Sequence, residues 1–547
     1  MTKSVIDPVT RIEGHLRVEM DVSNGEVTDA WCSGGLFRGM ELVLEGREPA
    51  DAAYISQRIC GVCPVSHANT SSFAGEAALG IEALPNGARL VRNIVECSQF
   101  LHSNILWLYN LTGLDYVDPT NALDADVASA YDLAQEAGTG ISDFGAVQEH
   151  LQTFIDNGQL SIFSGNWFDR DEYSLPAELD LIATAHYLES LEYQAIASEI
   201  SAAVGGKMPH VMTSIPGGTT YVPTISELDD ILAKAKKINT WVEGTLLPDA
   251  IAIATYYNRC FEYGQGVGRY IAWGVFNDES QEPSSRYLPS GVIDGNGELT
   301  QPDESLITEY TGHSYYKTDT NLNPREGVTD PEYPASGYDV NGKYTWSKSP
   351  HYNGEMYEAG PLSRMLVAYN SGVTRVQELV DYALTAVGAA GRLDLLQSTM
   401  GRVVARTCET VYISELIIDE IEELEAAVSG GDAEFFTEPT QSSGEGAGMW
   451  EAPRGALYHY EKVVNGKIEK YQIIIPSTWN IAPLDEDGNH GPMEQALIGV
   501  PVNDTDKPID ALRTVHSFDP CIACAVHVNE PATGKHFETV TNPWGVK

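Results

Sequence analysis

The sequence predicts a mainly helical α+β protein. It is expected to be a large bundle of long helices with a β-hairpin near each end of the chain and an irregular, β-rich excursion on the surface. Three observations support this prediction. Apolar residues recur every three or four positions over long stretches. Two Asn-Gly pairs lie between alternating segments, and the stretch 268–360 is interrupted by turn signals.

The elements follow from these patterns in chain order. Residues 15–22 alternate, and Asn24-Gly25 leads into the returning segment 27–31, which predicts a hairpin. A second hairpin is predicted at 457–476, turning at Asn465-Gly466. Between the two, helical periodicity predicts long helices over 86–111, 176–204, 225–263, 373–387 and 393–428. No internal repeat or long linker divides the chain, so a single large domain is expected.

Composition narrows the function. The 547 residues include 33 Lys and Arg against 78 Asp and Glu, a formal net charge of −45. Nucleic acid is therefore not expected as a partner, because phosphate binding needs clustered basic residues. No run reaches the roughly 18 apolar residues of a membrane span, and the N-terminus lacks the basic and apolar regions of a signal peptide.

Two Cys-x-x-Cys pairs carry the strongest chemical signal. They lie in the segments 58–67 (RICGVCPVSH) and 519–527 (DPCIACAVH). At the first turn of a helix this spacing points both sulfurs the same way, so the two pairs can form one four-thiolate metal site from opposite ends of the chain. Spacing alone leaves a structural zinc site or an iron-sulfur cluster open. A His follows each pair and can hydrogen-bond a sulfur.

With their surroundings, the pairs resemble the two signatures of the nickel-iron hydrogenase large subunit, most closely its respiratory hydrogen-uptake group. Further motifs resemble that family in the same order, namely residues 11–15 (RIEGH), 36–39 (LFRG), 452–455 (APRG) and 476–480 (PSTWN). The resemblance implies a single catalytic domain over 1–527. It also implies a C-terminal peptide, 528–547, removed by a maturation endopeptidase.

The resemblance further implies the metal ligands and the path of the proton. Cys60, Cys63, Cys521 and Cys524 would bind nickel, with Cys63 and Cys524 bridging to an iron that carries carbon monoxide and cyanide. Dihydrogen would be split heterolytically, with Cys521 as the first base and Glu13 as the next proton carrier. Soft thiolates suit such metals.

Other residues are assigned supporting roles by the same resemblance. Arg454 would hold a fixed positive charge beside the metals, and Ser477 would donate to a cyanide. His67 would bond a bridging thiolate. The remaining residues expected around the centre are Arg58, Pro453, Leu457, Pro476 and Asp519. Many respiratory members of the family have His-Asp-His where this chain has His102-Ser103-Asn104, so one acidic residue is expected to be missing.

A second metal site is implied near the C-terminus. Glu41, the carbonyl of Ile473 and His527 resemble the family's magnesium site. Carboxylate and carbonyl oxygens suit a hard divalent cation, although an imidazole is a less usual ligand, so the identity of the ion stays open.

Partners also follow from the resemblance. Electrons would leave through a small subunit with iron-sulfur clusters, and a membrane cytochrome b is a candidate further acceptor. A translocation signal on the small subunit would place the complex in the periplasm or at the membrane. Two alternatives remain: a cytosolic hydrogenase that reduces a soluble cofactor, and a non-catalytic four-cysteine metal scaffold.

Four cysteines and a group of glutamates lie outside the motifs. Cys32, Cys97, Cys260 and Cys408 lack ligand spacing, so they are expected to be small buried apolar residues. The acidic residues Glu420, Glu422, Glu423 and Glu425 are expected to form a solvated helix face.

Overall fold

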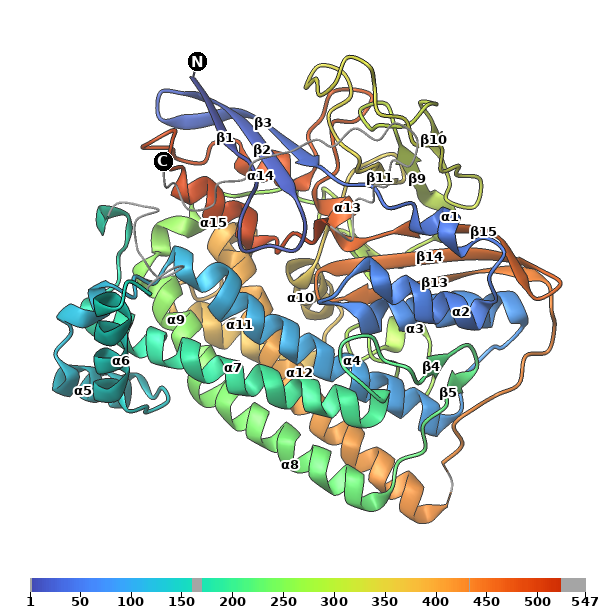
Figure 1. Ribbon diagram of the computed structural model, residues 1–547, viewed down its shortest axis with the longest axis horizontal. Helices are drawn as coiled ribbons and strands as arrows, with labels where there is room; N and C mark the ends of the chain where they lie inside the picture. Colours follow the sequence, from blue (N-terminus) through green and yellow to red (C-terminus); the bar gives the residue numbers. More distant parts are fainter. Residues whose placement is uncertain (1, 160–169, 432, 523–547) are drawn as a thin grey trace.

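The computed structural model describes residues 2–159, 170–431 and 433–522. Two predicted ligands, Cys524 and His527, and the predicted C-terminal peptide 528–547 therefore lie outside the described residues. Within the described part the fold is a helical bundle with small sheets on its periphery, which confirms the predicted class (Figure 1).

Four long helices form the centre of the bundle and lie side by side in Figure 1. They are α4 (Asn86–Leu106), α7 (Ala177–Gly205), α8 (Ile225–Trp241) and α12 (Thr399–Gly430). Most residues of α4 and most of the N-terminal two thirds of α12 are buried, because other elements cover them on all sides.

The remaining helices surround this centre. They are α1 (Met40–Leu44), α2 (Pro49–Ser56), α3 (Pro64–Leu79), α5 (Val127–Ala137), α6 (Phe144–Asp156), α9 (Leu247–Tyr256), α10 (Pro361–Asn370), α11 (Thr374–Ala386), α13 (Pro476–Asn480), α14 (Pro492–Leu497) and α15 (Ile509–Ser517). The helix predicted over 225–263 is divided: a π-helical segment, Val242–Leu246, separates α8 from α9. Pro248 lies just after this segment and lacks the N–H that a regular helix would use.

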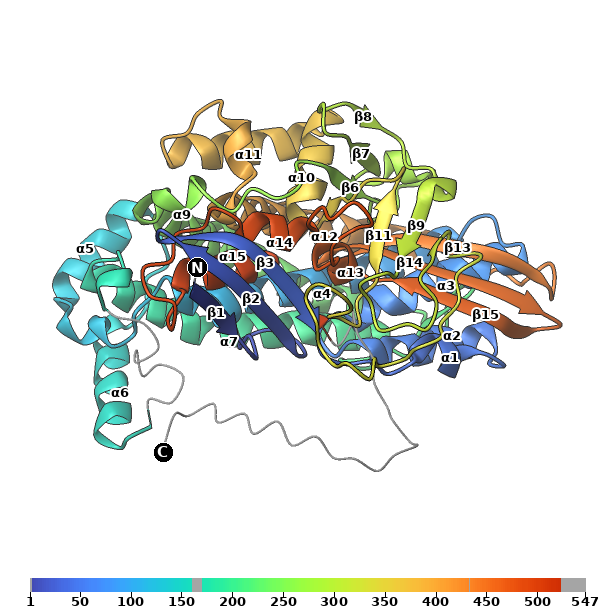
Figure 2. The ribbon, with the colours of Figure 1, turned by 90° about the horizontal axis from the view of Figure 1, so that it is seen from above.

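Both predicted hairpins are present. β2 (Leu16–Ser23) pairs with β3 (Glu26–Gly34), and β14 (Gly455–Val464) pairs with β15 (Lys467–Ile474). At each turn the Asn and the Gly both have positive φ, which is the conformation that an Asn-Gly hairpin turn requires. Each hairpin gains an unpredicted third strand, β1 (Thr2–Ile6) or β13 (Gly444–Ala452). Figure 2 shows α13 lying between the two sheets.

The predicted excursion at 268–360 is also present. It contains only short strands, which form a four-stranded and a three-stranded sheet. The strands are β6 (Tyr270–Ala272), β7 (Gly291–Ile293), β8 (Leu299–Thr300), β9 (Ile307–Tyr310), β10 (Asn321–Leu322), β11 (Ser349–Tyr352) and β12 (Glu358–Ala359). A separate pair, β4 (Ser214–Ile215) and β5 (Gly218–Thr219), lies outside the excursion.

Helix α3 lies very close to the sheet β13–β15. A Cβ atom on Gly446 would lie 2.5 Å from the Cβ of Ala77, and one on Gly448 would lie 2.1 Å from the carbonyl oxygen of Thr70. Only glycine allows this approach of helix to strand. The contact fixes α3, whose first turn follows the first cysteine pair, against the strands that carry the later motifs.

Two smaller predictions have different outcomes. Cys32, Cys97, Cys260 and Cys408 are buried and free, as expected. The solvated face is wrong for Glu420, which is 1% exposed and accepts a hydrogen bond from Asn93 at 2.9 Å. Here α12 packs on α4 and covers the carboxylate. Among the described residues, no helix combines the length and the apolar character needed to cross a membrane.

Candidate metal centre

Three of the four predicted cysteine ligands meet in the interior. Cys60 follows a short 3₁₀ helix, Cys63 is the N-cap residue of α3, and Cys521 lies after α15. Their sulfur atoms lie within 4.8 Å of one another, and the sulfurs of Cys60 and Cys521 are 3.3 Å apart. The two ends of the chain therefore meet at one cluster, as predicted for these three residues.

The surroundings of the cluster are apolar. Leu457, Ile475 and the three cysteines belong to one buried hydrophobic cluster. The backbone N–H groups of Val62 and Cys63 both donate to the Cys60 sulfur at 3.2 Å, which favours a thiolate there. If these buried sulfurs are thiolates they need a compensating charge, which a bound soft metal ion would supply.

Glu13 touches the cluster directly. The carbonyl of Glu13 accepts a hydrogen bond from the Ile522 N–H at 2.6 Å, which joins the two chain ends. The Cys521 thiol donates to the Glu13 carboxylate at 3.3 Å. A sulfur and a carboxylate in contact can exchange a proton without an intervening group.

The segment before Glu13 is held from the opposite side. The Arg11 guanidinium donates to the carbonyl of Leu111 and pairs with Asp115. The His516 ring bonds the same Asp115 and the carbonyl of Thr10. Although burial opposes it, Arg11 and His516 lower the pKa of the Asp115 carboxyl to about 2. This ion network anchors the loop and so fixes the position of Glu13.

Arg454 lies at the turn between β13 and β14 and is fully buried. Its Nη2 donates to the Asp519 carboxylate at 2.9 Å, and its Nε donates to the Asp519 carbonyl at 3.1 Å. Arg406 on α12 donates to the same carboxylate at 2.5 Å. Two guanidinium groups therefore share one carboxylate, which leaves an excess positive charge.

Both guanidiniums also keep an unused buried donor. Nη1 of Arg454 and Nη2 of Arg406 have no hydrogen-bond partner among the described residues. Buried N–H donors are rarely left unsatisfied. Free donors and excess positive charge suit a small group that is anionic or accepts hydrogen bonds. A cyanide bound to a metal is such a group. Sequence reasoning missed Arg406, because no motif surrounds it.

Ser477 supports Cys521 from α13. Its hydroxyl oxygen accepts a hydrogen bond from the Cys521 N–H at 2.9 Å. Because the oxygen acts here as acceptor, the hydroxyl proton stays available for another group. Pro476, at the first position of α13, and Leu457 are buried beside it.

His67 heads a buried chain of polar groups that runs away from the cysteines. Its Nδ1 bonds Nε2 of His459 at 3.1 Å, and Nδ1 of His459 bonds the Tyr471 hydroxyl at 2.7 Å. Burial lowers the pKa of His67 to about 4, so the ring is neutral at neutral pH. Nε2 of His67 has no hydrogen-bond partner among the described residues. His459 was missed because a lone His on a strand gives no sequence signal.

Arg58 is a predicted residue of the centre, and Ser103 stands where an Asp was expected. Arg58 is half-buried, stacks on the Tyr54 ring at 4.2 Å and donates to the carbonyl of Tyr54. Ser103 is buried on α4, and its hydroxyl has no partner among the described residues. Its neighbour His102 has a pKa of about 4, because burial and the charge of Arg454 both lower it. The segment 102–104 therefore lies close enough to Arg454 for the guanidinium charge to lower the pKa of His102.

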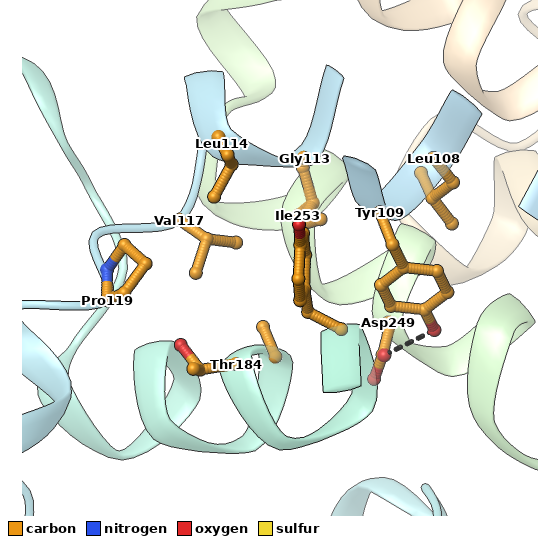
Figure 3. A pocket seen from close by; sticks show the side chains of 11 residues that line it. Leu108, Tyr109, Gly113, Leu114, Val117, Pro119, Thr184, Asp249 and Ile253 are labelled. Carbon is orange, nitrogen blue, oxygen red and sulfur yellow. Dashed lines mark hydrogen bonds between the residues drawn. The ribbon is translucent and has the colours of Figure 1, made fainter. Parts of the chain in front are cut away.

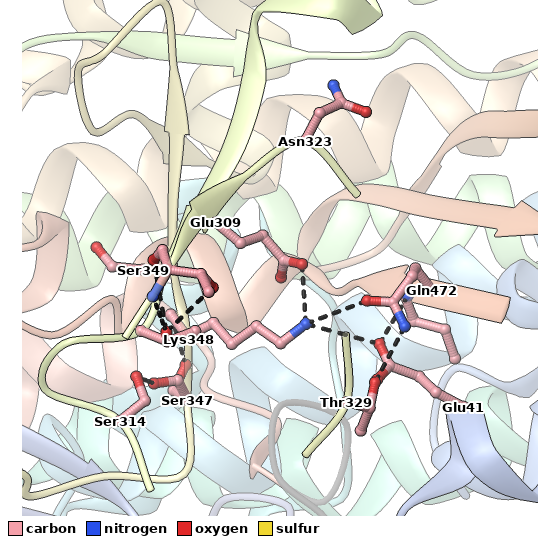
Figure 4. Close-up of polar contacts among 12 residues, drawn as sticks. Glu41, Glu309, Ser314, Asn323, Thr329, Ser347, Lys348, Ser349 and Gln472 are labelled. Carbon is pink, nitrogen blue, oxygen red and sulfur yellow. Dashed lines mark hydrogen bonds and ion pairs between the residues drawn. The ribbon is translucent and has the colours of Figure 1, made fainter. Parts of the chain in front are cut away.

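Glu41 and Ile473 meet in a second cluster, and Figure 4 shows Glu41 there with Lys348 and Glu309. The Ile473 N–H donates to the Glu41 carboxylate at 3.0 Å. The Lys348 ammonium lies 3.9 Å from Glu41 and 2.9 Å from Glu309. One oxygen of Glu309 has no partner among the described residues. Two carboxylates against one ammonium leave a net negative charge, which fits a further cation, although the third predicted ligand, His527, is outside the described residues.

A separate cavity lies between the π-helical end of α4, α7 and α9 (Figure 3). Leu108, Val117 and Ile253 line it, and the Tyr109 hydroxyl donates to Asp249 at 2.8 Å beside it. None of the predicted site residues lines this cavity, so it is not part of the cysteine centre.

Comparison with known proteins agrees with this site. A family model described as nickel-dependent hydrogenase matches residues 38–527. A shorter model described as HoxL-like matches residues 3–32. Together the two models cover both cysteine pairs and the segment that contains Glu13.

Individual relatives match over nearly the whole chain. The hydrogenase-2 large chain of Escherichia coli strain K12 is 38% identical over 552 residues, which cover 96% of both chains. The uptake hydrogenase large subunit of Afipia carboxidovorans is 36% identical and covers 96% of this chain and 94% of its own. The reduced Ni-Fe-Se hydrogenase from Desulfovibrio vulgaris Hildenborough superimposes with a TM-score of 0.80 at 34% identity, over 96% of this chain and 100% of that one.

Proposed function

Because this chain belongs to the nickel-dependent hydrogenase family as a large subunit, we propose that it is the catalytic half of an uptake hydrogenase that oxidises dihydrogen. At the family level it is an enzyme that contains a nickel-iron centre. The direction, H2 to two protons and two electrons, is proposed from the relatives named uptake hydrogenases.

The observation that carries the proposal is the contact between Cys521 and Glu13. A bound nickel-iron centre would supply the position at which dihydrogen is polarised and the route for its electrons. The Cys521 sulfur, 3.3 Å from the Glu13 carboxylate, would take up the released proton and pass it to that carboxylate. The contact makes this transfer a single step.

The other residues of the centre would hold the metals and exclude water. Cys60, Cys63 and Cys521, with Cys524, would be the thiolate ligands. Arg454 would direct its free Nη1 at one diatomic ligand of iron, and Ser477 would direct its hydroxyl proton at another. Leu457 and the surrounding apolar cluster would keep the centre dry, which strengthens these interactions.

We propose a small subunit with iron-sulfur clusters as the electron-carrying partner. Its interface would lie over the first cysteine pair, where Tyr54 and Met212 are 42% and 55% exposed. Gln57 Nε2 donates to the Val211 carbonyl, which holds the Met212 segment beside that pair. Large exposed apolar side chains grouped in this way are typical of an interface. Export with that partner would place the enzyme in the periplasm or at the membrane, with a membrane cytochrome b as a further acceptor.

We also propose a magnesium ion or another divalent cation at Glu41, with the Ile473 carbonyl and His527 as further ligands. The net negative charge of Glu41, Glu309 and Lys348 supports it. The residues after His527 would be removed by an endopeptidase during maturation.

The test is H2-dependent reduction of a redox dye by the anaerobically purified native complex. Wild type is expected to reduce the dye, and Cys521→Ser is expected to abolish reduction, because the serine hydroxyl stays protonated at neutral pH and its hard oxygen is a poor ligand for a soft metal. Cys408→Ser is the control, since that cysteine is buried in a different hydrophobic cluster from Cys60, Cys63 and Cys521. A wild-type complex with nickel but without dye reduction would contradict the proposal.

A further inference from the structure

Arg364 on α10 is a fully buried arginine with every donor in use. Its Nε and Nη2 form a two-pronged pair with Glu409 of α12 at 2.5 and 3.0 Å. Its Nη1 donates to the Glu451 carboxylate at 2.7 Å. The two remaining N–H groups donate to main-chain carbonyls, those of Ala452 at 2.9 Å and Pro453 at 2.8 Å.

The two carbonyls belong to the turn that carries Arg454. That turn joins β13 to β14, and Arg454 follows Pro453 directly. Gly360, the N-cap residue of α10, lies close against it: a Cβ on Gly455 would lie 2.6 Å from the Gly360 nitrogen. The position of the Arg454 side chain therefore depends on a turn whose carbonyls are held by one guanidinium.

We propose that Arg364 is a positioning residue, which sets the direction of the free Arg454 donor by holding the Ala452 and Pro453 carbonyls against α10 and α12. The inference rests on the proposed function, because it assigns Arg454 a place beside the metal centre. Arg364 itself touches neither the cysteines nor a substrate position, so it acts through Arg454.

The chemistry of the site requires a guanidinium. Only a planar fork of five N–H groups can bind two carboxylates and two carbonyls at once. A lysine keeps the charge but has three donors from one atom, so it would release part of the turn. Arg364 is also the cation that faces the buried carboxylates Glu409 and Glu451. Removing the charge would break the ion pairs that Arg364 forms with both carboxylates.

The matched control is Arg92 on α4. It is also buried, pairs with one carboxylate, Glu76, and donates to two main-chain carbonyls, those of Ile215 and Gly218. None of these groups belongs to the metal centre. Arg92→Lys therefore measures how much stability and activity change when a buried arginine of this protein loses part of its hydrogen bonds while Arg454 stays in place.

The experiment compares Arg364→Lys and Arg92→Lys in the native complex, each alone and combined with Arg454→Lys. Arg364→Lys is expected to lower the turnover of H2 oxidation by about 10- to 100-fold, as small displacements of a positioned group do. Its nickel content should match that of wild type. The double variant Arg364→Lys, Arg454→Lys should be no slower than Arg454→Lys alone, because both changes remove one effect. Arg92→Lys should combine additively with Arg454→Lys.

An infrared spectrum provides a readout independent of turnover. If Arg364 positions Arg454, then Arg364→Lys and Arg454→Lys shift the same cyanide stretch, and Arg92→Lys shifts none. Additive rate effects, or an unshifted cyanide stretch in Arg364→Lys, would overturn the inference. If Arg364→Lys does not accumulate as folded protein, Glu409→Gln serves instead. It weakens the pair that ties Arg364 to α12, so it should shift the same cyanide stretch as Arg454→Lys, and an unshifted stretch would contradict the inference.

The outcomes also separate this inference from the proposed function. A wild-type complex without infrared bands of metal-bound ligands would contradict the proposed function. An active wild type with additive variants would contradict only the role of Arg364.

Discussion

Cys521 contacts three residues from distant parts of the sequence. Its sulfur meets Cys60 and Glu13, and its N–H meets Ser477. The motifs identified all four residues, because each lies in a recognisable segment. Only the family resemblance implied that Cys521 meets Cys60 and Glu13; residue patterns alone could not predict it, since a contact between residues 13 and 521 depends on the whole fold between them. His459, Arg406 and Arg364 escaped prediction for the converse reason: their roles come only from buried hydrogen bonds.

Glu13→Gln tests the proton transfer at the residue scale. The amide keeps the size of the side chain and its hydrogen bond from Cys521, but it cannot take up a proton at neutral pH. Loss of a positioned proton acceptor typically costs about 10²- to 10⁴-fold in rate. H2 oxidation should fall by that order while nickel content stays constant. The exposed Glu26→Gln is the control, and a Glu13→Gln complex with undiminished turnover would exclude Glu13 from the proton path.

Glu461 makes a pH-dependent prediction. Both of its carboxylate oxygens are buried without a hydrogen-bond partner among the described residues, and burial raises its pKa to about 8. Between about pH 4.5 and 8 the unfolded chain loses this proton while the folded chain keeps it. The free energy of unfolding should therefore fall as pH rises through that window.

Glu461→Gln should remove this loss, since the amide stays neutral at every pH. The quantity compared is the unfolding free energy of the variant minus that of wild type. We expect this difference to be a few kcal/mol larger at pH 8 than at pH 5, because each unit of pKa shift is worth about 1.4 kcal/mol. Denaturant titrations at the two pH values measure it. An equal difference at both would show that Glu461 ionises normally in the folded protein.

Helices and hairpins were the most predictable elements. Periodicity placed the long helices, and the Asn-Gly pairs placed both turns, because these signals are local. Among the features that the patterns missed, two have a tertiary cause. Strand β13 contains Gly444, Gly446 and Gly448 and so resembles a loop, but these glycines let α3 approach the sheet. The break between α8 and α9 was missed because the apolar pattern continues through it.

Gly448→Ala tests this close packing at the scale of an element. Its new methyl group would lie 2.1 Å from the Thr70 carbonyl, so α3 must move away from β13. Overpacking of this kind costs about 1–3 kcal/mol or more, and it should also displace Cys63 and His67. We expect a lower melting temperature and reduced nickel content.

Gly244→Ala is the comparison for that variant. A Cβ there meets nothing within 4 Å, and the residue is helical, so its melting temperature should be unchanged or higher. If Gly448→Ala and Gly244→Ala behaved alike, the glycines of β13 would have no role in setting the distance between helix and sheet.

At the scale of the whole molecule, the helices bring the two ends of the chain to one buried cluster. The mainly helical class and the surface excursion followed from the sequence, and so did the family. The arrangement of the buried charges could not be predicted from the sequence. The net charge of −45 gave no indication that buried ion pairs, such as Arg364 with Glu409 and Arg11 with Asp115, hold the loops around the centre. Such pairs form only after distant segments pack.

The central claim is that this buried cysteine cluster holds a nickel-iron centre with diatomic ligands. Its most direct test is an infrared spectrum of the anaerobically purified native complex, with metal analysis of the same sample and a mass for this chain. Intrinsic bands of metal-bound carbon monoxide and cyanide, together with nickel, are predicted once the C-terminal peptide has been removed. A chain of the shortened mass that contained zinc, lacked nickel and showed no such bands would contradict the claim.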